Sequence, residues 1–375
     1  MYSSRFLFST MITPERLGWV DALLKSRCSP HGLTDERVMV YLSGDALYSL
    51  IHPLTAPVWA AIASRPGICL YADTDDTADL GVIPYLPASL PVRSDTIKRI
   101  FLKDDEEPVH SAGFLHLYSP YMYRHTDFFL GIARQAIDLS VSLSVILYLD
   151  GVHLGHRNHR TREFSNAEQE MDAIRKKATD TRTLLEIAAC ERCSLARGYL
   201  HGEDGIVHPA PCFREDMRIS GLSNLIPPFS SSDLVLSADC GDIPGDGKEA
   251  YLLFVTLTPY GTENTFGALS WAVALAGREI PARIIYVEDG VYSSIEIPGS
   301  RISGSVRDIR AVADAMAVPG LLEFFVWTPS LTMRGIQNRN LTDGSECMQP
   351  IGTDGIERIR EDLSAAGYHV RILIW

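Results

Sequence analysis

The chain has 375 residues, of which 46% are hydrophobic and 22% charged, the balance of an ordinary globular protein. Its formal net charge of -13 argues against a nucleic-acid partner, because neutralising phosphates requires clustered Lys and Arg. No run reaches the roughly 18 apolar residues of a membrane span, and seven cysteines, an odd number, do not suit a disulfide framework, so we expect a cytoplasmic protein without a membrane partner.

Three stretches of the chain share one order of predicted elements: a strand, a helix and a second strand. In the first stretch these elements fall at 4–10, 13–27 and 37–51. In the second they fall at 112–122, 126–139 and 141–154, and in the third at 250–261, 262–277 and 281–295. The second strands end in "DALY" (45–48), "DGVH" (150–153) and "DGVY" (289–292).

The correspondence continues further along the chain. "CERCSLARGYL" (190–200) matches "WTPSLTMRGI" (327–336) with an Arg-Gly pair in register, and 231–239 and 365–375 predict closing strands. Alternating strands and helices predict an α/β fold with mainly parallel, Rossmann-like sheets, one sheet per copy. Polar segments at 103–108 and 238–249 predict linkers, which gives domains over 1–105, 106–240 and 249–375.

Cys190 and Cys193 are the residues most suggestive of chemistry. "TLLEIAA" predicts a strand and "ERCSLARGYL" a helix, which places Cys190 at a helix N-terminus. Unpaired N–H groups there favour a thiolate, as do the nearby Arg192 and Arg197. Such a thiolate can take the outer sulfur of a persulfide, and Cys193, one turn on, could displace that sulfur or close a disulfide.

Three other interpretations of the two cysteines stay open. They can be a buried structural pair, or part of a zinc site with Cys212, His201 and His208, whose spacing matches no common zinc module. The third interpretation is a redox-active dithiol of the thioredoxin type, which usually follows a different arrangement of strand and helix from the one predicted here. We expect no metal and no cofactor, since the nucleotide-binding and serine-hydrolase motifs are also missing from the sequence.

These motifs, in the same order in three copies, resemble the DsrE family of sulfurtransferase-like proteins and its DsrF, DsrH and Tus relatives. The similarity is strongest in the middle copy, through "YLDGV", "CERCSLARG" and "RISGLSNLI", and continues in the last through "TPYGTENTFGALSWAVAL" and "VEDGVY". The resemblance implies three fused, Rossmann-like DsrE-like domains, the first of them degenerate. Because relatives assemble as trimers or hexamers of single-domain subunits, it also implies an intramolecular pseudo-trimer, and a self-dimer of such pseudo-trimers.

In the family the working residue is a cysteine eight positions before the glycine of an Arg-Gly pair, where it carries sulfur as a persulfide. Counting back from Gly198 reaches Cys190, whereas counting from Gly81 and Gly335 reaches Asp73 and Trp327. Only the middle copy then keeps the nucleophile. Asp150 and His153 follow a predicted strand, at the edge where α/β proteins bind ligands, and are candidates for substrate binding.

The sequence therefore predicts a sulfur-relay protein in which Cys190 accepts sulfane sulfur and passes it on, with sulfur-donor and sulfur-acceptor proteins as partners. The alternative is a non-catalytic DsrE-like scaffold whose cysteines are structural. Cys212 can be a second sulfur acceptor or simply packed, and Cys28, Cys69, Cys240 and Cys347 are interpreted as structural.

Overall fold

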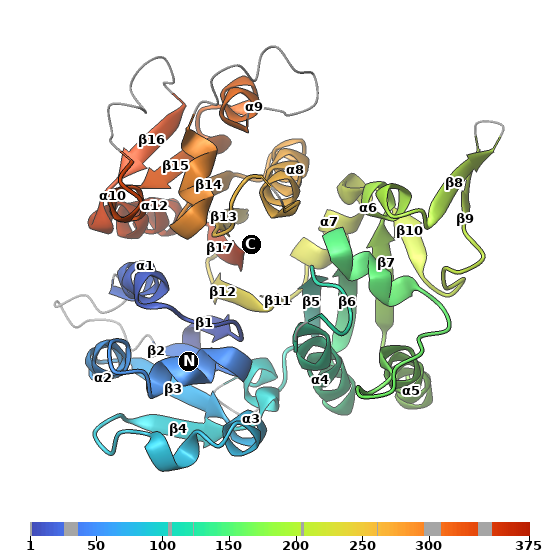
Figure 1. Cartoon of the computed structure of the whole chain (residues 1–375), viewed down its shortest axis with the longest axis horizontal. Helices are drawn as coiled ribbons and strands as arrows, with labels where there is room; N and C mark the ends of the chain where they lie inside the picture. The colour runs from blue at the N-terminus through green and yellow to red at the C-terminus, as the bar shows by residue number, and fades with distance from the viewer. Residues whose placement is uncertain are drawn as a thin grey trace.

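The computed structural model describes residues 2–25, 37–103, 107–122, 124–203, 206–260, 262–295, 309–336 and 347–375, so Cys28 lies outside the described residues. Over this part the chain has the expected α/β fold. One sheet has ten strands, a second has five, and β8 and β9 form a separate hairpin. Figure 1 shows three lobes around a centre: a first lobe (2–103), a middle lobe (107–236) and a third lobe (249–375).

The first lobe contains four parallel strands and their helices. Its elements are β1 (Tyr2–Phe8), α1 (Pro14–Lys25), β2 (Arg37–Leu42), η1 (Gly44–Leu50), α2 (Ala56–Ala63), β3 (Ile68–Asp73), α3 (Thr74–Asp79), η2 (Ile83–Tyr85), β4 (Val92–Asp95) and η3 (Ile97–Phe101), where η marks a 3-10 helix.

The middle lobe carries the five-stranded sheet. Its elements are β5 (Ser111–His116), α4 (His125–Asp138), β6 (Ser142–Leu147), η4 (Leu149–Gly155), α5 (Ala167–Thr181), β7 (Leu185–Cys190), α6 (Glu191–Ala196), β8 (Leu200–Glu203), β9 (Ile206–Pro209), β10 (Arg218–Ser220), α7 (Leu222–Ser230) and β11 (Leu234–Leu236).

The third lobe follows the same plan. Its elements are β13 (Glu249–Val255), α8 (Asn264–Ala276), β14 (Ala282–Tyr286), η5 (Glu288–Ser294), α9 (Ile309–Met316), β15 (Leu322–Trp327), α10 (Thr328–Met333), β16 (Met348–Ile351), α12 (Thr353–Ala365) and β17 (His369–Ile374). The strand orders β10-β7-β6-β5-β11 and β16-β15-β14-β13-β17 match, and β4-β3-β2-β1 repeats the first four places.

The fifth place in the first lobe is taken by β12 (Asp239–Ile243), which pairs antiparallel with both β1 and β17. The first and third lobes thereby share the ten-stranded sheet, so the expectation of one sheet per copy is wrong for these two. The predicted linker at 238–249 is also wrong over β12, because its aspartates are buried and bonded. Asp239 accepts from the Ser9 backbone N–H at 2.7 Å, and Asp242 bonds His369 at 2.9 Å.

The second strand of each lobe is shorter than the sequence predicts. β2, β6 and β14 each give way to a 3-10 helix, η1, η4 and η5. The first residues of these helices, Gly44, Leu149 and Glu288, have φ of 51°, 51° and 52°, in the left-handed region that ends an extended strand. The apolar run continues through the helix because its residues are buried as well.

Aromatic side chains pack the lobes together. Trp19 of α1 stacks on Phe254 of β13 with ring centroids 4.7 Å apart, which joins the first lobe to the third. Tyr148 meets Trp271 and Trp375 at 5.8 and 5.6 Å, which joins the middle lobe to the third. Within the described residues, none of the helices has both the length and the apolar character needed to cross a membrane.

Candidate functional site

Cys190 is the last residue of β7 and the N-cap of α6, so the predicted junction of strand and helix is confirmed. Its φ of -67° and ψ of 124° are extended, and Glu191 begins the helix. The first N–H groups of a helix have no partner within it. The Cys190 side chain makes no capping hydrogen bond, but the nearby backbone N–H groups of Cys193 and Arg192 help to lower its pKa.

The thiol of Cys193 also hydrogen-bonds to the Cys190 sulfur, and this bond is the main reason that the pKa of Cys190 is lowered to about 7. Burial acts against the shift, since the Cys190 side chain is 1% exposed. The same bond, together with burial, raises the pKa of Cys193 far above its usual range. Cys190 is therefore the residue of the pair that ionises near neutral pH, and Cys193 keeps its proton there.

Cys193 makes a further bond on its other side. Its sulfur accepts the backbone N–H of Leu149 at 3.3 Å. Leu149 begins η4 with a positive φ that side chains other than glycine seldom adopt. Cys193 therefore ties α6 to the turn that follows β6.

The two candidate arginines have different surroundings. Arg192 lowers the pKa of Cys190 by its charge, and its guanidinium donates to Ser270 Oγ of α8 at 3.2 Å. Arg197 instead donates to Asp150 at 2.6 Å and to Glu263 at 2.8 Å. The charge of Arg197 lowers the pKa of Cys193, whereas the charge of Arg192 lowers that of Cys190. Arg192 is thus the better placed of the two to activate Cys190.

Asp150 and His153 lie in η4, next to the thiol pair but bonded elsewhere. His153 Nδ1 shares a hydrogen bond of 2.7 Å with the Tyr199 hydroxyl, and its Nε2 lies 3.9 Å from Asp150. Burial lowers the pKa of His153, against the opposing charge of Asp150. These contacts make Asp150 a partner of Arg197 and place His153 in a cluster with Tyr199.

Residues of α8 in the third lobe lie close to η4 and to the tyrosine beside the thiol pair. The Tyr148 hydroxyl donates to Gly267 O of α8 at 3.1 Å, and nearby Cys193 and Cys190 help to raise its pKa, after burial. A Cβ on Gly267 would lie 2.8 Å from Leu149 Cδ1, so η4 and α8 are in close contact. The quoted motifs "YLDGV" and "TPYGTENTFGALSWAVAL" contain Tyr148 and Gly267, but no local pattern in either motif predicts the contact between them.

The positions that correspond to Cys190 have the same place in the other lobes. Asp73 is the N-cap of α3 and Trp327 the N-cap of α10, each at the end of the third strand of its lobe. The glycines eight residues later, Gly81, Gly198 and Gly335, have φ of 63°, 74° and 67°. The spacing used to align the three copies therefore corresponds to one repeated structural unit.

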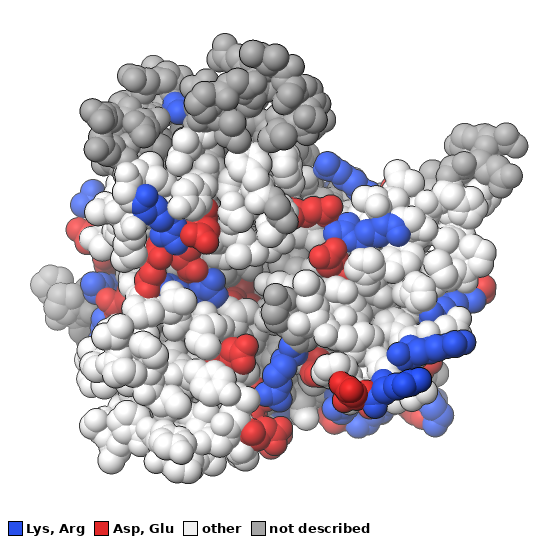
Figure 2. Space-filling model, in the orientation of Figure 1, with Lys and Arg blue, Asp and Glu red and all other residues white. Residues whose placement is uncertain are grey.

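Ion pairs connect each of these units to the start of a helix in the next lobe. Arg197 of the middle lobe meets Glu263 before α8 at 2.8 Å, and Arg334 of the third lobe meets Glu15 of α1 at 2.8 Å. At the remaining boundary Arg124, before α4, lies 3.6 Å from Asp76 of α3. Figure 2 shows charged side chains gathered between the lobes on the face that it displays.

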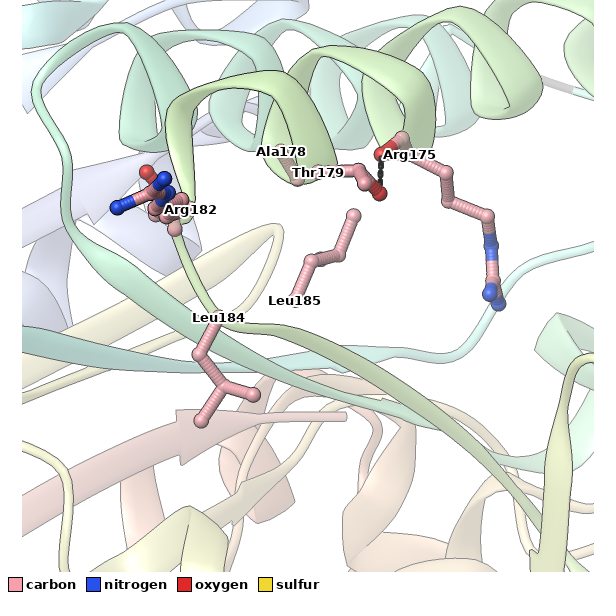
Figure 3. Close-up of a pocket in the computed structure, with 7 residues that line it drawn as sticks. Arg175, Ala178, Thr179, Arg182, Leu184 and Leu185 are labelled. Carbon is pink, nitrogen blue, oxygen red and sulfur yellow. Dashed lines mark hydrogen bonds between the residues drawn. The ribbon is translucent and has the colours of Figure 1, made fainter.

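Two cavities in the described part of the chain lie away from the thiol pair. One of about 420 Å³ is lined by Arg175, Arg182 and Leu184 (Figure 3) and lies between α5 and the beginning of β7. Cys190 is at the other end of this strand, five residues or about 17 Å away. A second, of about 470 Å³, is lined by residues such as Lys103, Glu249 and Arg371, at the starts of β13 and β17.

Among the described residues, no group of three or more His, Cys, Asp or Glu is placed to hold a metal ion. His201 and His208, considered above as zinc ligands, face each other across the β8–β9 hairpin. The six described cysteines are free thiols: Cys69, Cys190, Cys193, Cys212, Cys240 and Cys347. A zinc site at Cys190 and Cys193 therefore has no support in the described part of the chain.

No protein-family model matches the sequence, and a comparison with curated proteins found no match either. Among solved structures the chain is similar to one titled "Crystal structure of ychN protein from E.coli", with 18% sequence identity and a TM-score of 0.25. The similarity covers 34% of this chain and 98% of that one.

Proposed function

We propose that this chain is a DsrE-like sulfur-relay protein in which Cys190 carries sulfane sulfur as a persulfide. The observation that supports this most is the position of Cys190 at the N-cap of α6, beside the Cys193 thiol, which is the main cause of the lowering of its pKa to about 7. The first lobe offers an internal parallel. Asp73, at the corresponding position, accepts from the N–H groups of Asp75 and Asp76 at 3.0 and 2.9 Å.

The proposed step is an exchange between thiols and needs no oxidant. The Cys190 thiolate attacks the outer sulfur of a donor persulfide, R–S–SH, which gives Cys190–S–SH and releases R–S⁻. An acceptor thiolate, R′–S⁻, then takes the outer sulfur and restores the Cys190 thiolate. Donor and acceptor would be proteins or small molecules that present a reactive sulfur.

We also propose that the three lobes act together as an intramolecular pseudo-trimer. The ion pairs at the three boundaries favour this, because each joins one repeated unit to the next lobe. Joining the lobes in one chain raises their effective concentration into the millimolar range or so. In this arrangement the third lobe contributes a wall beside Cys190 through Gly267 and Ser270.

Intact-mass measurement after incubation with thiosulfate or polysulfide tests the relay. We expect the wild type to gain sulfur, Cys190→Ser to lose that gain, and Cys69→Ser, a change in β3 of the first lobe, to keep it. Equal gain of sulfur by wild type and Cys190→Ser would refute the proposal.

A scaffold without sulfur chemistry is the second candidate, because the Cys190 side chain is only 1% exposed. The first and third lobes favour the scaffold as well, because they carry Asp73 and Trp327 at the position of Cys190 and so have no thiol there. Alkylation at neutral pH distinguishes the two. A relay requires Cys190 to react faster than free cysteine, whose pKa is about 8.5, whereas a structural, inaccessible thiol reacts no faster.

A further inference from the structure

The three lobes show what the position of Cys193 does in the fold. Three residues after each N-cap, α3, α6 and α10 carry Asp76, Cys193 and Ser330. Each accepts the backbone N–H of the first residue in the neighbouring 3-10 helix. The donors are Gly44 at 2.7 Å, Leu149 at 3.3 Å and Glu288 at 2.8 Å, respectively.

These three bonds hold the same unusual turn. The donor residues all have φ of 51° or 52°, and Leu149 is only 5% exposed. A buried N–H in this conformation needs an acceptor, because water does not reach it. In the first and third lobes the acceptor is a side-chain oxygen, of Asp76 and of Ser330. The turn therefore requires a hydrogen-bond acceptor at this position and does not require sulfur.

Ser330 shows that one side chain can make both bonds. Its Oγ accepts from Glu288 N and donates to the Glu15 carboxylate at 2.5 Å. Cys193 is placed for the same pair of functions, since its sulfur accepts from Leu149 N at 3.3 Å and its thiol, three residues after Cys190, is the main cause of the lowered pKa of Cys190. In both lobes the residue connects the turn to an anionic group.

We propose that Cys193 is a positioning residue that holds the η4 turn and donates a hydrogen bond to the Cys190 thiolate, and that it never carries or resolves sulfur. This inference rests on the proposed relay at Cys190 and gives that site a single sulfur carrier. Closing a Cys190–Cys193 disulfide would remove the Cys193 S–H donor and leave a weaker sulfur acceptor for Leu149 N.

The proposal separates two chemical outcomes. If Cys193 resolved the persulfide, Cys190–S–SH and Cys193–SH would give a disulfide and H₂S. With Cys193 as a positioning residue, an external thiolate takes the outer sulfur, so that Cys190–S–SH and R′–S⁻ give Cys190–S⁻ and R′–S–SH. The Cys193 proton stays in place in this second reaction, and no disulfide forms.

The first test compares Cys193→Ser with Cys193→Ala by alkylation of Cys190 across pH, followed at the Cys190 peptide by mass spectrometry. Serine can make both bonds and alanine neither. We expect the apparent pKa of Cys190 to stay within about half a unit of wild type with serine and to rise by about one unit or more with alanine. A serine variant that loses the lowered pKa overturns the proposal, even if the alanine variant does not fold. So does an alanine variant that keeps the lowered pKa.

The second test follows sulfur-loaded protein without an acceptor thiol. We expect no sulfide release and no Cys190–Cys193 disulfide until a small thiol is added, and transfer from Cys193→Ser within about twofold of wild type. Stoichiometric release of sulfide with disulfide formation overturns the positioning role. If the wild type takes up no sulfur, the relay itself fails, while the alkylation comparison still decides what Cys193 does.

Discussion

Arg192 brings a positive charge to Cys190 from the first turn of α6, and Ser270 of the third lobe holds its guanidinium at 3.2 Å. Its effect on the thiol is modest, because the side chain is exposed and water screens its charge. Residues of two lobes thus adjust one reactive group, and removing either should weaken the thiolate without unfolding the chain.

We expect Arg192→Gln to raise the pKa of Cys190 by about half a unit and to slow its alkylation at neutral pH by about twofold. Ser270→Ala should give a smaller change in the same direction. Arg182→Gln is the matched control, since Arg182 lies beside the start of β7, at the other end of the strand from Cys190. The pH profile of alkylation at the Cys190 peptide measures all three, and an equal shift in Arg182→Gln would contradict this assignment.

His116 provides a pH dependence that is separate from the thiols. Its ring is fully buried at the end of β5, beside His125 and Thr126, and burial lowers its pKa to about 3. Between this value and the ordinary value of 6.5, the unfolded chain binds a proton that the folded chain does not. His116 therefore destabilises the fold as the pH falls below 6.5.

Urea unfolding at pH 7 and pH 5 measures this effect. Wild type should lose about 2 kcal/mol more free energy of unfolding over that interval than His116→Gln, whose side chain does not titrate. The comparison cancels groups that titrate in both proteins. An identical loss in the two proteins would show that the ring is protonated in the folded state.

At the scale of elements, the turns η4 and η5 require glycine as their third residue. A Cβ on Gly151 would lie 2.1 Å from His116 O, and one on Gly290 would lie 2.0 Å from Val255 O. Both contacts are with backbone atoms, which cannot move aside without shifting a central strand. The "DGV" of the sequence motif thus reflects how closely the turn approaches the neighbouring strand.

Gly151→Ala should lower the free energy of unfolding by about 3 kcal/mol or more. Gly198→Ala is a useful comparison, because no atom lies within 4 Å of its Cβ position and only the positive φ is unfavourable. That change should cost about 1 kcal/mol. Urea denaturation of both variants measures the two losses in free energy of unfolding. Equal losses would mean that the backbone shifts to accommodate the Cβ at position 151 at little cost.

Patterns of apolar residues predicted the repeated strand–helix–strand order and the junction at Cys190. They overextended the second strands, because buried residues such as Val152 and Leu154 continue the apolar run through a 3-10 helix. They also missed β12, whose Asp and Gly content is typical of a linker. Its carboxylates are satisfied by Ser9 and His369, which are distant in sequence. The contact of Arg192 with Ser270 could not be predicted from local sequence patterns either, because the two residues are also distant in the sequence.

Across the whole molecule, β12 makes the first and third lobes one structural unit. Its residues pair with β1 on one side and with β17 on the other, and the middle lobe keeps its own sheet. Buried Arg371 adds to the junction through its bond with Asp242 and its bond of 3.2 Å with Glu249. The stability of the two outer lobes should therefore be coupled.

Gly241 is the residue through which this coupling can be tested. It pairs with Phe6 and with Ile372, and a Cβ there would lie 2.7 Å from the Phe6 ring and 3.2 Å from Ile372 Cδ1. Gly241→Val should therefore disturb both contacts of β12 at once. Hydrogen exchange followed by mass spectrometry should show faster exchange in β1 and β17 together, while β6 and β7 of the middle lobe keep wild-type protection.

Gly131→Val is the control, because Gly131 lies in α4 with no atom within 4 Å of its Cβ position. Valine is also a better helix former than glycine, so this variant should exchange like wild type in both sheets. Loss of protection in only one of the two outer lobes would mean that β12 belongs to that lobe alone. Loss in β6 and β7 as well would mean that the middle sheet also depends on β12, so that all three lobes unfold as one unit.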